Sequence, residues 1–363
     1  MTVVSVIQIE QSKRDLWDDE IGRFENAHPF NAFGWGMVRA IDGWKPTYLI
    51  AKSGSLVTGA IMMLRKPVPF TGFSIMYSPR GPVCDTADIE TLKALLKRVC
   101  VEGSRRRAIF LRIDPNIPSE MFRDVDPFVA AGFTHLQTPW SFWNAPPHVY
   151  RVRLNHGKSE DDIFKLISPK ARTGIRKSRK EKVAIRSAES VEDVLAFYQI
   201  FQHFADDKGF MARSYLYQEA LWNEYISKGK GILFLAIYQD KIVGGEICLV
   251  FGQTCAEMHR AVYYKYHKLR VNEALVWEGI RWARERGCLW YSLRGAGPTP
   301  SHDDFKKKFA SEMVSLAGYY DLVFLPKLYR IFVKSEFDML PLIWPFLVKA
   351  RRLCMNLTNR FKP

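Results

Sequence analysis

The chain has 363 residues, enough for two domains with their own cores, and its 47% hydrophobic and 25% charged residues are ordinary for a folded globular protein. Its net charge of +15 favours a polyanionic partner such as nucleic acid, anionic lipid or a phosphorylated substrate, and a basic protein without such a partner is the alternative. The six cysteines lack zinc-binding spacing, so we expect no metal site. The sequence contains neither a signal peptide nor a run of about 20 apolar residues that could span a bilayer. We therefore expect a cytoplasmic protein.

The first elements predicted along the chain are a β-hairpin, a third strand and a helix. The stretch PTYLIAKSGSLVTGAIMMLR, from Pro46, contains two β-rich runs around a tight polar turn, and a third apolar run covers residues 73–77. In ADIETLKALLKRVCVEG the apolar residues recur with the period of a helix, which is expected to stop at Gly103 before the strand AIFLRIDP.

The second half of the chain repeats this order of elements. Three prolines interrupt the pattern in PWSFWNAPPHVY, after which VYRVRL predicts a strand and residues 159–167 and 190–206 predict helices. The stretch GILFLAIYQDKIVGGEICLVF then echoes the first hairpin. It is followed by an apolar run at residues 255–263, a helix that stops at Gly287, and the strand CLWYSLRG.

The order strand–turn–strand–strand–helix–strand therefore occurs twice. Hairpins are common, so a chance echo is the alternative, but the agreement of five elements in order favours a duplication. We predict an α/β (α+β) fold of two similar domains with mixed sheets. The first domain is expected at residues 1–147 plus 318–363, where the strand YYDLVFLP returns to complete it, and the second at residues 148–317.

Basic residues concentrate in the segment PKARTGIRKSRKEKVAIR. Arg172, Arg176 and Lys180 recur every four residues and would line one helical face, where a bound phosphate would relieve their mutual repulsion. A solvated basic face is the alternative. The tail DMLPLIWPFLVKARRLCMNLTNRFKP mixes apolar and basic residues, so it either lies on an anionic membrane surface or packs on the first domain.

Several common enzyme motifs are absent from the sequence, which contains no P-loop, no G-x-S-x-G and no H-E-x-x-H. Each half resembles the fold of the GCN5-related N-acetyltransferases, whose glycine-rich loop cradles the pyrophosphate of coenzyme A. The corresponding position here reads HKLRVNEALVWEG, with Asn272 and Glu273 in place of glycines. Bulky and acidic side chains there would keep backbone amides from a pyrophosphate, so acetyl-CoA is disfavoured as the donor.

Several segments together resemble the FemABX peptidyltransferases, the tRNA-dependent enzymes that build the interpeptide bridges of peptidoglycan. These segments span nearly the whole chain and are FGWGMVRAIDGW, YSPRGPVCD, FLRIDP, SPKARTGIRKSRK, VNEALVWEGIRWARERG, and SLRGAG followed by FKKKFA. The resemblance implies two acetyltransferase-like domains, the first completed by the C-terminal segment. The coiled-coil arm of some members is not expected, because no heptad stretch lies between the domains.

The resemblance assigns the main catalytic role to Lys306. The family signature F-K-x-x-F-G reads FKKKFA here, with Ala310 in place of glycine, and Lys306 would stabilise the oxyanion formed when an amine attacks the aminoacyl ester. Phe305 and Phe309 would face one side and pack the segment, with Phe305 beside the substrate, whereas the alternative is three lysines on an exposed helix start. Asp85 matches an acidic position that would orient the attacking ammonium or take its proton, or else it caps the following helix.

The resemblance also implies a set of substrate-binding residues. Arg39 falls where members carry a lysine, Arg172 aligns with an arginine at the start of the basic helix, and Arg176 stands one turn later. These arginines would bind the diphosphate of the precursor. The residues expected to flank the same pocket are Tyr77, Arg80 and Gly81.

These features predict an aminoacyltransferase that moves an amino acid from aminoacyl-tRNA to an amine of a phosphorylated cell-wall precursor, lipid II or UDP-MurNAc-pentapeptide. An aminoacyl ester is already activated, so the resemblance implies neither a metal nor a cofactor. We expect a cytoplasmic monomer with peripheral contact to the inner membrane face. The alternatives are an N-acyltransferase with an acyl-CoA or acyl-carrier donor in polysaccharide or lipid modification, and a non-catalytic protein that binds tRNA or the membrane surface.

Overall fold

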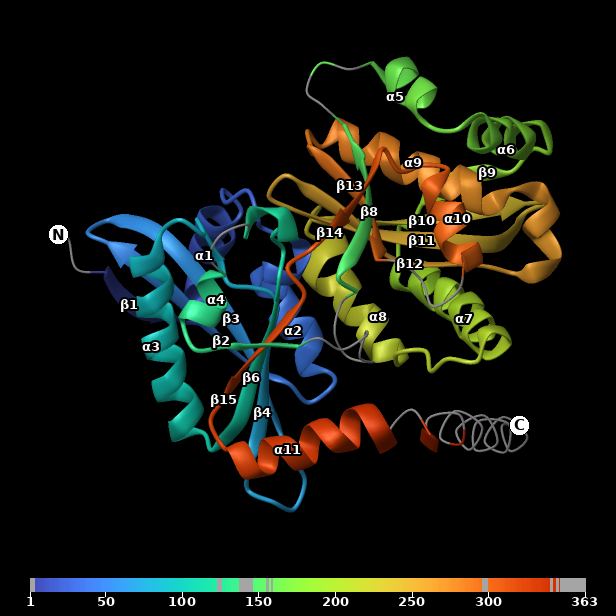
Figure 1. The fold of residues 1–363 in the computed structure, drawn as a ribbon. Helices are drawn as coiled ribbons and strands as arrows, with labels where there is room; N and C mark the ends of the chain where they lie inside the picture. Colours follow the sequence, from blue (N-terminus) through green and yellow to red (C-terminus); the bar gives the residue numbers. More distant parts are fainter. Residues whose placement is uncertain are drawn as a thin grey trace.

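The computed structural model describes residues 4–122, 126–136, 146–154, 157, 159–295, 300–339, 342, 343 and 346, without the side chains of residues 300–302. It contains two mixed β-sheets with helices packed on their faces (Figure 1). The predicted α/β class and the two mixed sheets are thus confirmed. The boundary predicted between the domains falls largely on residues 137–145, outside the described residues, so the division at residues 147 and 317 stays a prediction.

The first sheet takes strands from distant parts of the chain, in the order β1-β2-β3-β4-β6-β15-β7, with β5 paired to β3. Strands β4 and β6 are parallel, and β15 is antiparallel to both β6 and β7. The C-terminal strand therefore belongs to this sheet. The strands are β1 (Val4–Ile9), β2 (Lys45–Ser53), β3 (Leu56–Pro67), β4 (Ser74–Arg80), β5 (Val83–Cys84), β6 (Ala108–Pro115), β7 (Thr134–Leu136) and β15 (Tyr319–Val323).

The second sheet has the order β14-β8-β13-β12-β11-β10-β9, with β12 and β13 parallel. Strand β8, which opens the second half, lies beside β13 in the same way that β15 lies beside β6. Both sheets thus repeat one arrangement, as the duplication predicts. The strands are β8 (His148–Arg153), β9 (Ala184–Ser187), β10 (Gly231–Tyr238), β11 (Lys241–Phe251), β12 (Thr254–Val262), β13 (Trp290–Gly295) and β14 (Glu312–Ser315).

The helices begin at local capping signals. Ser168 accepts a hydrogen bond from the backbone of Ala171 and is followed by a proline, which starts α6, and Ser159 and Asp162 cap α5 reciprocally. The helices are α1 (Arg14–Ile21), α2 (Phe33–Ala40), α3 (Ile89–Arg105), α4 (Pro127–Ala130), α5 (Glu160–Leu166), α6 (Pro169–Lys180), α7 (Val191–Lys208), α8 (Tyr215–Leu221), α9 (Val271–Glu285), α10 (Pro300–Lys307) and α11 (Pro326–Lys334). In the described part of the chain no helical arm extends from either sheet (Figure 1).

Apolar cores alternate with the two sheets. Helix α3 packs on one face of the first sheet, and α9 packs on one face of the second. Between the sheets lies a middle layer in which α1 and α2 from the first half meet α7 and α8 from the second. One continuous core fills this layer and includes Trp17, Trp35, Phe197 and Tyr225. Because both halves contribute to this core, the geometry between them is fixed.

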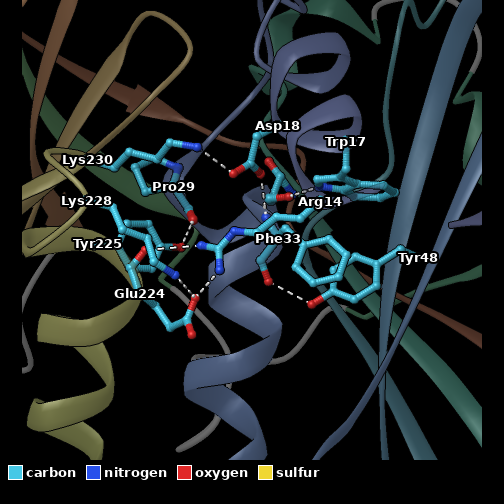
Figure 2. Close-up of polar contacts among 11 residues, drawn as sticks. Arg14, Trp17, Asp18, Pro29, Phe33, Tyr48, Glu224, Tyr225, Lys228 and Lys230 are labelled. Atoms are coloured by element: carbon cyan, nitrogen blue, oxygen red, sulfur yellow. Dashed lines mark hydrogen bonds and ion pairs between the residues drawn. The ribbon is translucent and has the colours of Figure 1, made fainter. Parts of the chain in front are cut away.

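Polar contacts also cross the middle layer (Figure 2). Arg14 on α1 donates to the carboxylate of Glu224 at 2.5 Å, and Lys230 donates to the buried Asp18 at 2.8 Å. Asp18 also accepts a hydrogen bond of 2.7 Å from the backbone N–H of Phe33, at the start of α2. One carboxylate therefore links two helices of the first half to the second half.

The sequence prediction for the end of α3 was wrong. The helix does not stop at Gly103 but continues to Arg105. Gly103 serves packing instead, because a Cβ at this position would lie 2.5 Å from the ring of Phe324, which follows β15. The glycine allows the C-terminal segment to approach the helix closely.

A buried charged group holds the C-terminal segment to the first sheet. The guanidinium of Arg112 on β6 donates to both carboxylate oxygens of Asp321 on β15, each at 2.8 Å. The same guanidinium donates to Glu336, beyond α11, at 2.8 and 3.0 Å. All three side chains are buried, so each charge depends on the others for compensation.

Candidate active site

Lys306 lies on α10, the short helix that follows β13, and its side chain is half-buried. Its ammonium donates to the backbone carbonyl of Gly295, the last residue of β13. Burial lowers the pKa of Lys306 to about 8. Nearby Glu257 opposes this shift, and the cations Arg294 and Arg260 add to it. Lys306 is therefore a positioned cation that is mostly protonated at pH 7.

The structure distinguishes Lys306 from the two lysines that follow it. Lys307 is exposed, and the ammonium of Lys308 lies over the ring of Phe305, 5.5 Å from its centroid. The rings of Phe305 and Phe309 are 5.4 Å apart and both pack in the core beside α9, as predicted. This packing anchors α10 and leaves the first lysine of the run facing the end of β13.

A buried carboxyl pair lies next to Lys306. Glu246 on β11 and Glu257 on β12 are both buried, and each has one carboxylate oxygen without a hydrogen-bond partner among the described residues. The hydroxyl of Tyr291 donates to Glu246 at 2.7 Å. Burial, and then the proximity of Glu257, raises the pKa of Glu246 to about 8. At pH 7 the pair therefore holds one proton and one negative charge, and the charge acts on Lys306.

A cavity of about 460 Å³ opens between the two halves, and it contains two residues of the predicted site, Arg80 and Asp85. Asp85 is exposed and accepts from the backbone N–H of Ala87, whereas the cap of α3 is Asp88. The capping alternative for Asp85 is thus wrong, and its carboxylate faces the cavity. The other lining residues are Arg23, Phe24, Glu25, Asn26, His28, Cys84, Thr86, Asn116, Ile117, Pro118, Met121, Val149, Arg151, Thr254, Trp290, Ser292 and Leu316.

Tyr77 and Gly81 are not among the residues that line this cavity. The buried Tyr77 donates its hydroxyl to Asp114 at 2.7 Å, and the second oxygen of Asp114 accepts from the backbone N–H of Arg80 at 2.6 Å. A Cβ on Gly81 would lie 2.3 Å from the hydroxyl of Ser78. Tyr77 and Gly81 therefore shape the backbone that presents Arg80, which itself adopts a positive φ of 55°.

Arg39 belongs to a separate group of cations. It is buried on α2, 3.9 Å from Asp42, and its Nε has no hydrogen-bond partner among the described residues. Arg213, between α7 and α8, donates to the same Asp42 at 2.7 Å. The charged ends of Arg39 and Lys66 both lie 5.5 Å from the ring centroid of Trp44. One carboxylate thus lies among three cations, and the cluster retains a net positive charge.

Two histidines indicate the positive potential of the region between the halves. Burial, followed by the charges of Arg80 and Arg294, lowers the pKa of His28 well below its usual range. Burial, Arg294 and Arg213 lower the pKa of His259 to about 3. Both imidazoles are therefore neutral at pH 7, as expected where cations surround them. Arg294 is exposed, and its guanidinium donates to the backbone carbonyl of Met258.

The predicted arginines of α6 lie elsewhere. Figure 1 places α6 on the side of the second sheet away from the first half. Arg172 donates to the backbone carbonyls of Lys165 and Ile167, and the guanidinium of Arg176 lies over the ring of Phe164. These contacts tie α6 to α5. The structure therefore does not bring Arg172 and Arg176 together with the arginine of α2.

A second cavity, of about 350 Å³, lies at the start of α9 and is bordered by another face of α6. The lysines on its wall are Lys170, Lys177 and Lys308, and Arg270 and Glu273 come from the segment where a coenzyme A loop would lie. The remaining lining residues are Pro169, Thr173 and Gly174. The cavity is thus cationic overall, with one carboxylate placed at the helix start.

Some residues of these clusters were not identified from the sequence. Glu246 and Glu257 had a signal, since each is a charged residue inside an apolar strand, where charges occur only with partners. Arg213 and Lys66 had none, because their neighbours come from distant parts of the chain. Within the described residues, no three His, Cys, Asp or Glu side chains are grouped so that they could hold a metal ion.

Comparison with known sequences gives a family match and distant relatives. The model of the FemAB family matches residues 16–238. The lipid II:glycine glycyltransferase of Staphylococcus haemolyticus (strain JCSC1435) is 23% identical over 244 residues, which cover 65% of this chain and 57% of that protein. The enzyme of the same name from Staphylococcus aureus (strain USA300) is 22% identical over 268 residues, covering 72% and 62%. The chain thus spans about three fifths of the length of these relatives.

Solved structures show the same fold at low sequence identity. A crystal structure of FemX superposes with a TM-score of 0.81 at 16% identity, covering 90% of this chain and 99% of the other. A tandem GNAT protein from the clavulanic acid biosynthesis pathway superposes with a TM-score of 0.53 at 10% identity, covering 88% and 98%. The duplicated acetyltransferase-like fold is therefore common to all three chains.

Proposed function

Because the chain belongs to the FemAB family, we propose that it transfers an aminoacyl group from aminoacyl-tRNA to an amine of a peptidoglycan precursor, lipid II or UDP-MurNAc-pentapeptide. The name shared by its relatives, lipid II:glycine glycyltransferase, supports this class of acceptor. The observation that carries the proposal is the half-buried ammonium of Lys306, held on the carbonyl of Gly295 at the end of β13 with Arg260 and Arg294 nearby, although Lys306 is not among the residues that line the 460 Å³ cavity.

In the proposed reaction the acceptor amine attacks the carbonyl carbon of the aminoacyl ester. The carbonyl oxygen becomes an oxyanion, and Lys306 donates a hydrogen bond to it. The C–O bond to the ribose then breaks, and the ribose oxygen leaves with the proton that the amine releases. Removal of a positioned donor of this kind typically slows acyl transfer by about 100- to 1000-fold.

Asp85 is proposed to orient the attacking amine. Its exposed carboxylate lines the cavity together with Glu25, so the two negative charges would bind and orient an ammonium group that enters, and Asp85 would accept the proton that this group must lose before the amine attacks. Arg80 lines the same cavity and would hold a carboxylate or carbonyl of the acceptor stem. Tyr77 and Gly81 would act through the backbone of Arg80 rather than by contact with the substrate.

The cluster of Arg39, Lys66 and Arg213 is proposed to bind the diphosphate of the acceptor. Its cations outnumber its single carboxylate, and the unpartnered Nε of Arg39 offers a donor. For Arg172 and Arg176, binding to the precursor stays a prediction, and their present contacts are local to α5 and α6.

The donor is proposed to bind on the second half. Backbone phosphates of tRNA would bind the exposed lysines Lys170 and Lys177 of α6, at the rim of the cavity rather than inside it, and Phe305 would lie beside the terminal ribose near Lys306. In this assignment residues 1–147 and 318–363 bind the precursor, with Arg213 of the second half added at its diphosphate, and residues 148–317 bind the donor. We expect a cytoplasmic monomer that contacts the membrane peripherally.

A different donor is the main alternative. The fold shared with a tandem GNAT protein favours an acyl-CoA or acyl-carrier donor, with polysaccharide or lipid as acceptor. Glu273 argues against it, because this carboxylate lies in the cavity where a pyrophosphate would bind. A non-catalytic protein that binds tRNA or membranes would not require a half-buried lysine such as Lys306, held at the end of β13.

One experiment separates these possibilities. The protein is incubated with tRNA charged with labelled amino acids and with each purified precursor, and label on the precursor is measured. We expect transfer that Lys306→Ala abolishes and the matched Lys307→Ala retains. Transfer that survives Lys306→Ala would remove the role given to that residue. Turnover of acyl-CoA without any transfer from tRNA would overturn the proposed function.

A further inference from the structure

The C-terminal helix α11 is fixed to the first sheet through one face. Phe332 and Tyr329 pack against Phe110 of β6, with ring centroids 5.0 and 5.5 Å apart. Beyond the helix, Glu336 binds the buried Arg112 at 2.8 Å. These contacts hold the segment in one orientation and leave its other face in solvent.

The free face of this segment is both apolar and basic. Ile331, Leu342 and Phe346 are 67%, 72% and 73% exposed, and Lys327 and Lys334 are exposed as well. Single exposed apolar residues are common, but a series of them on one segment indicates an interaction surface. After residue 338 the sequence carries five basic residues and no Asp or Glu.

The loop between β3 and β4 places another exposed apolar side chain at the end of the first sheet where α11 begins. The connection between β3 and β4 carries Phe70, which is fully exposed. Ser74, at the start of β4, pairs with Ala108 of β6, and Leu325, just before α11, donates to the carbonyl of the adjacent Ile109 at 3.1 Å. This register places the loop and the start of α11 at one end of the first sheet (Figure 1).

Arginines at the end of α3 complete the surface. Arg105 and Arg107 are exposed immediately before β6, and Arg107 lies over the ring of Phe73 in the same β3–β4 connection. We propose that this end of the first half, formed by Phe70, Arg105, Arg107 and the free face of α11 with its continuation, is a docking edge for an anionic membrane. Its apolar side chains would enter the interface and its cations would meet acidic headgroups.

The charge of the docking edge distinguishes a membrane from a second copy of the chain. Two copies joined through this edge would bring Arg105, Arg107, Lys327 and Lys334 of each together, and the single exposed Asp338 on this segment would not balance them, which is unfavourable. Among the described residues no helix is long and apolar enough to cross a bilayer, so the contact would be confined to the surface.

The same register relates the docking edge to the active site, a step that rests on the proposed function. Lys66 of the diphosphate-binding cluster pairs with Ile75, one residue from the start of β4, whereas Arg80 at the cavity ends that strand. The five strand steps from Ile75 to Arg80 span about 16 Å. A pentapeptide stem spans up to about 17 Å. An acceptor with its lipid in the membrane and its diphosphate on the cluster would therefore reach the cavity, so the geometry favours a lipid-linked acceptor.

Vesicle binding tests the docking edge without any catalytic assay. The full-length protein is sedimented with phosphatidylcholine vesicles that contain phosphatidylglycerol, and with pure phosphatidylcholine vesicles. We expect binding to the anionic vesicles only, weakened by salt. Phe70→Ser combined with Leu342→Ser should reduce partitioning about tenfold or more, because two apolar side chains no longer enter the interface.

Leu56→Ser is the matched control, because Leu56 is 66% exposed and begins β3 at the end opposite the docking edge. This variant should bind like the wild type, and thermal melts should show that all variants fold. Equal binding to neutral vesicles, equal loss in the control, or a dimer that the double variant disrupts would each overturn the docking edge.

A transfer assay then tests the lipid-linked acceptor. The Phe70→Ser/Leu342→Ser variant should raise KM for a lipid-linked precursor in anionic vesicles and leave transfer to the soluble UDP-linked precursor unchanged. Vesicle binding as expected, but with no transfer to any precursor, would defeat the proposed function and leave the docking edge standing. Unimpaired transfer to the lipid-linked precursor by this variant would defeat the docking edge alone.

Discussion

Burial and the neighbouring charges have opposing effects on the pKa of Lys306. Burial and the cations Arg260 and Arg294 favour its neutral form, whereas Glu257 favours the charged form. With a pKa of about 8, Lys306 is mostly protonated at pH 7 and loses its proton as the pH rises through 8. Because only the protonated form donates to an oxyanion, the rate of transfer should decline over the same interval.

Removing the negative charge of the carboxyl pair should move this decline to lower pH. In a Glu246→Gln/Glu257→Gln double variant, Lys306 loses the neighbour that raises its pKa. The midpoint of the decline should therefore fall by about one pH unit. The pH dependence of kcat at saturating substrate measures this shift.

The single variants are the controls for this prediction. Glu246 has a pKa of about 8 and is largely protonated at pH 7. Glu246→Gln alone therefore exchanges one neutral group for another and should leave the midpoint nearly unchanged. Glu257→Gln alone should give a smaller shift than the double variant, because the pKa of Glu246, although still raised by burial, falls when the repulsion of Glu257 is lost, and Glu246 then carries part of the negative charge. An unchanged midpoint in the double variant would show that the pair does not act on Lys306.

Arg213→Ala should weaken binding of a diphosphate-linked precursor. The variant removes one cation and its hydrogen bonds from the cluster around Asp42, a loss of about 2 kcal/mol, which corresponds to a Kd about 30-fold higher. Titration calorimetry with UDP-MurNAc-pentapeptide measures this change. Lys97→Ala, on the exposed side of α3, is the matched control and should leave Kd unchanged. Wild-type affinity in Arg213→Ala would restrict the diphosphate site to Arg39 and Lys66.

The residues that could be predicted from the sequence are those with local signals. Lys306 and Phe305 belong to the motif FKKKFA, and Asp85 directly follows the motif RGPVC, so the FemABX resemblance could assign a role to each of them. Arg213 could not be assigned, because its partner Asp42 is 171 positions away and nothing beside it in the sequence reveals that contact.

Elements follow the same rule. Both hairpins and both central helices could be predicted, because turn residues and helical periodicity are local. The return of β15 to the first domain was expected from the sequence pattern and from the family resemblance, but its partner strand β6 could not be identified, since the contact of Arg112 with Asp321 joins residues 209 positions apart. The end of α3 was mispredicted for a related reason. A glycine in a helical pattern predicts the end of the helix, and the sequence does not show that the ring of Phe324 packs against Gly103.

Gly103→Ala should therefore destabilise the protein. Alanine in place of glycine inside a helix usually adds about 1 kcal/mol of stability. Here the added Cβ would collide with the ring of Phe324, so we expect a net loss of about 1–3 kcal/mol in urea unfolding. Ser104→Ala, at the exposed next position, is the control and should stabilise slightly. A stabilising Gly103→Ala would mean that the C-terminal segment does not pack there.

At the scale of the whole molecule, the two halves share one core. The sequence predicts two domains, because the apolar period of each helix shows which side chains are buried. It does not show against what they are buried. In the structure, α2 of the first half packs against α8 of the second. The ring centroids of Trp35 and Tyr217 are 6.5 Å apart across that contact. The middle layer is thus built like a domain interior, and the cleft that carries the site depends on it.

We therefore expect both halves to unfold in a single cooperative transition. Calorimetry should give one peak whose calorimetric and van't Hoff enthalpies agree. Lys230→Ala leaves the buried carboxylate of Asp18 with the Phe33 amide as its one remaining hydrogen-bond donor among the described residues, so Tm should fall while the transition stays single. Lys93→Ala removes an exposed ion pair within α3 and should change Tm little. Two transitions in the wild type, with Lys230→Ala lowering only one of them, would mean that each half is stable alone and that the middle layer is an interface between domains.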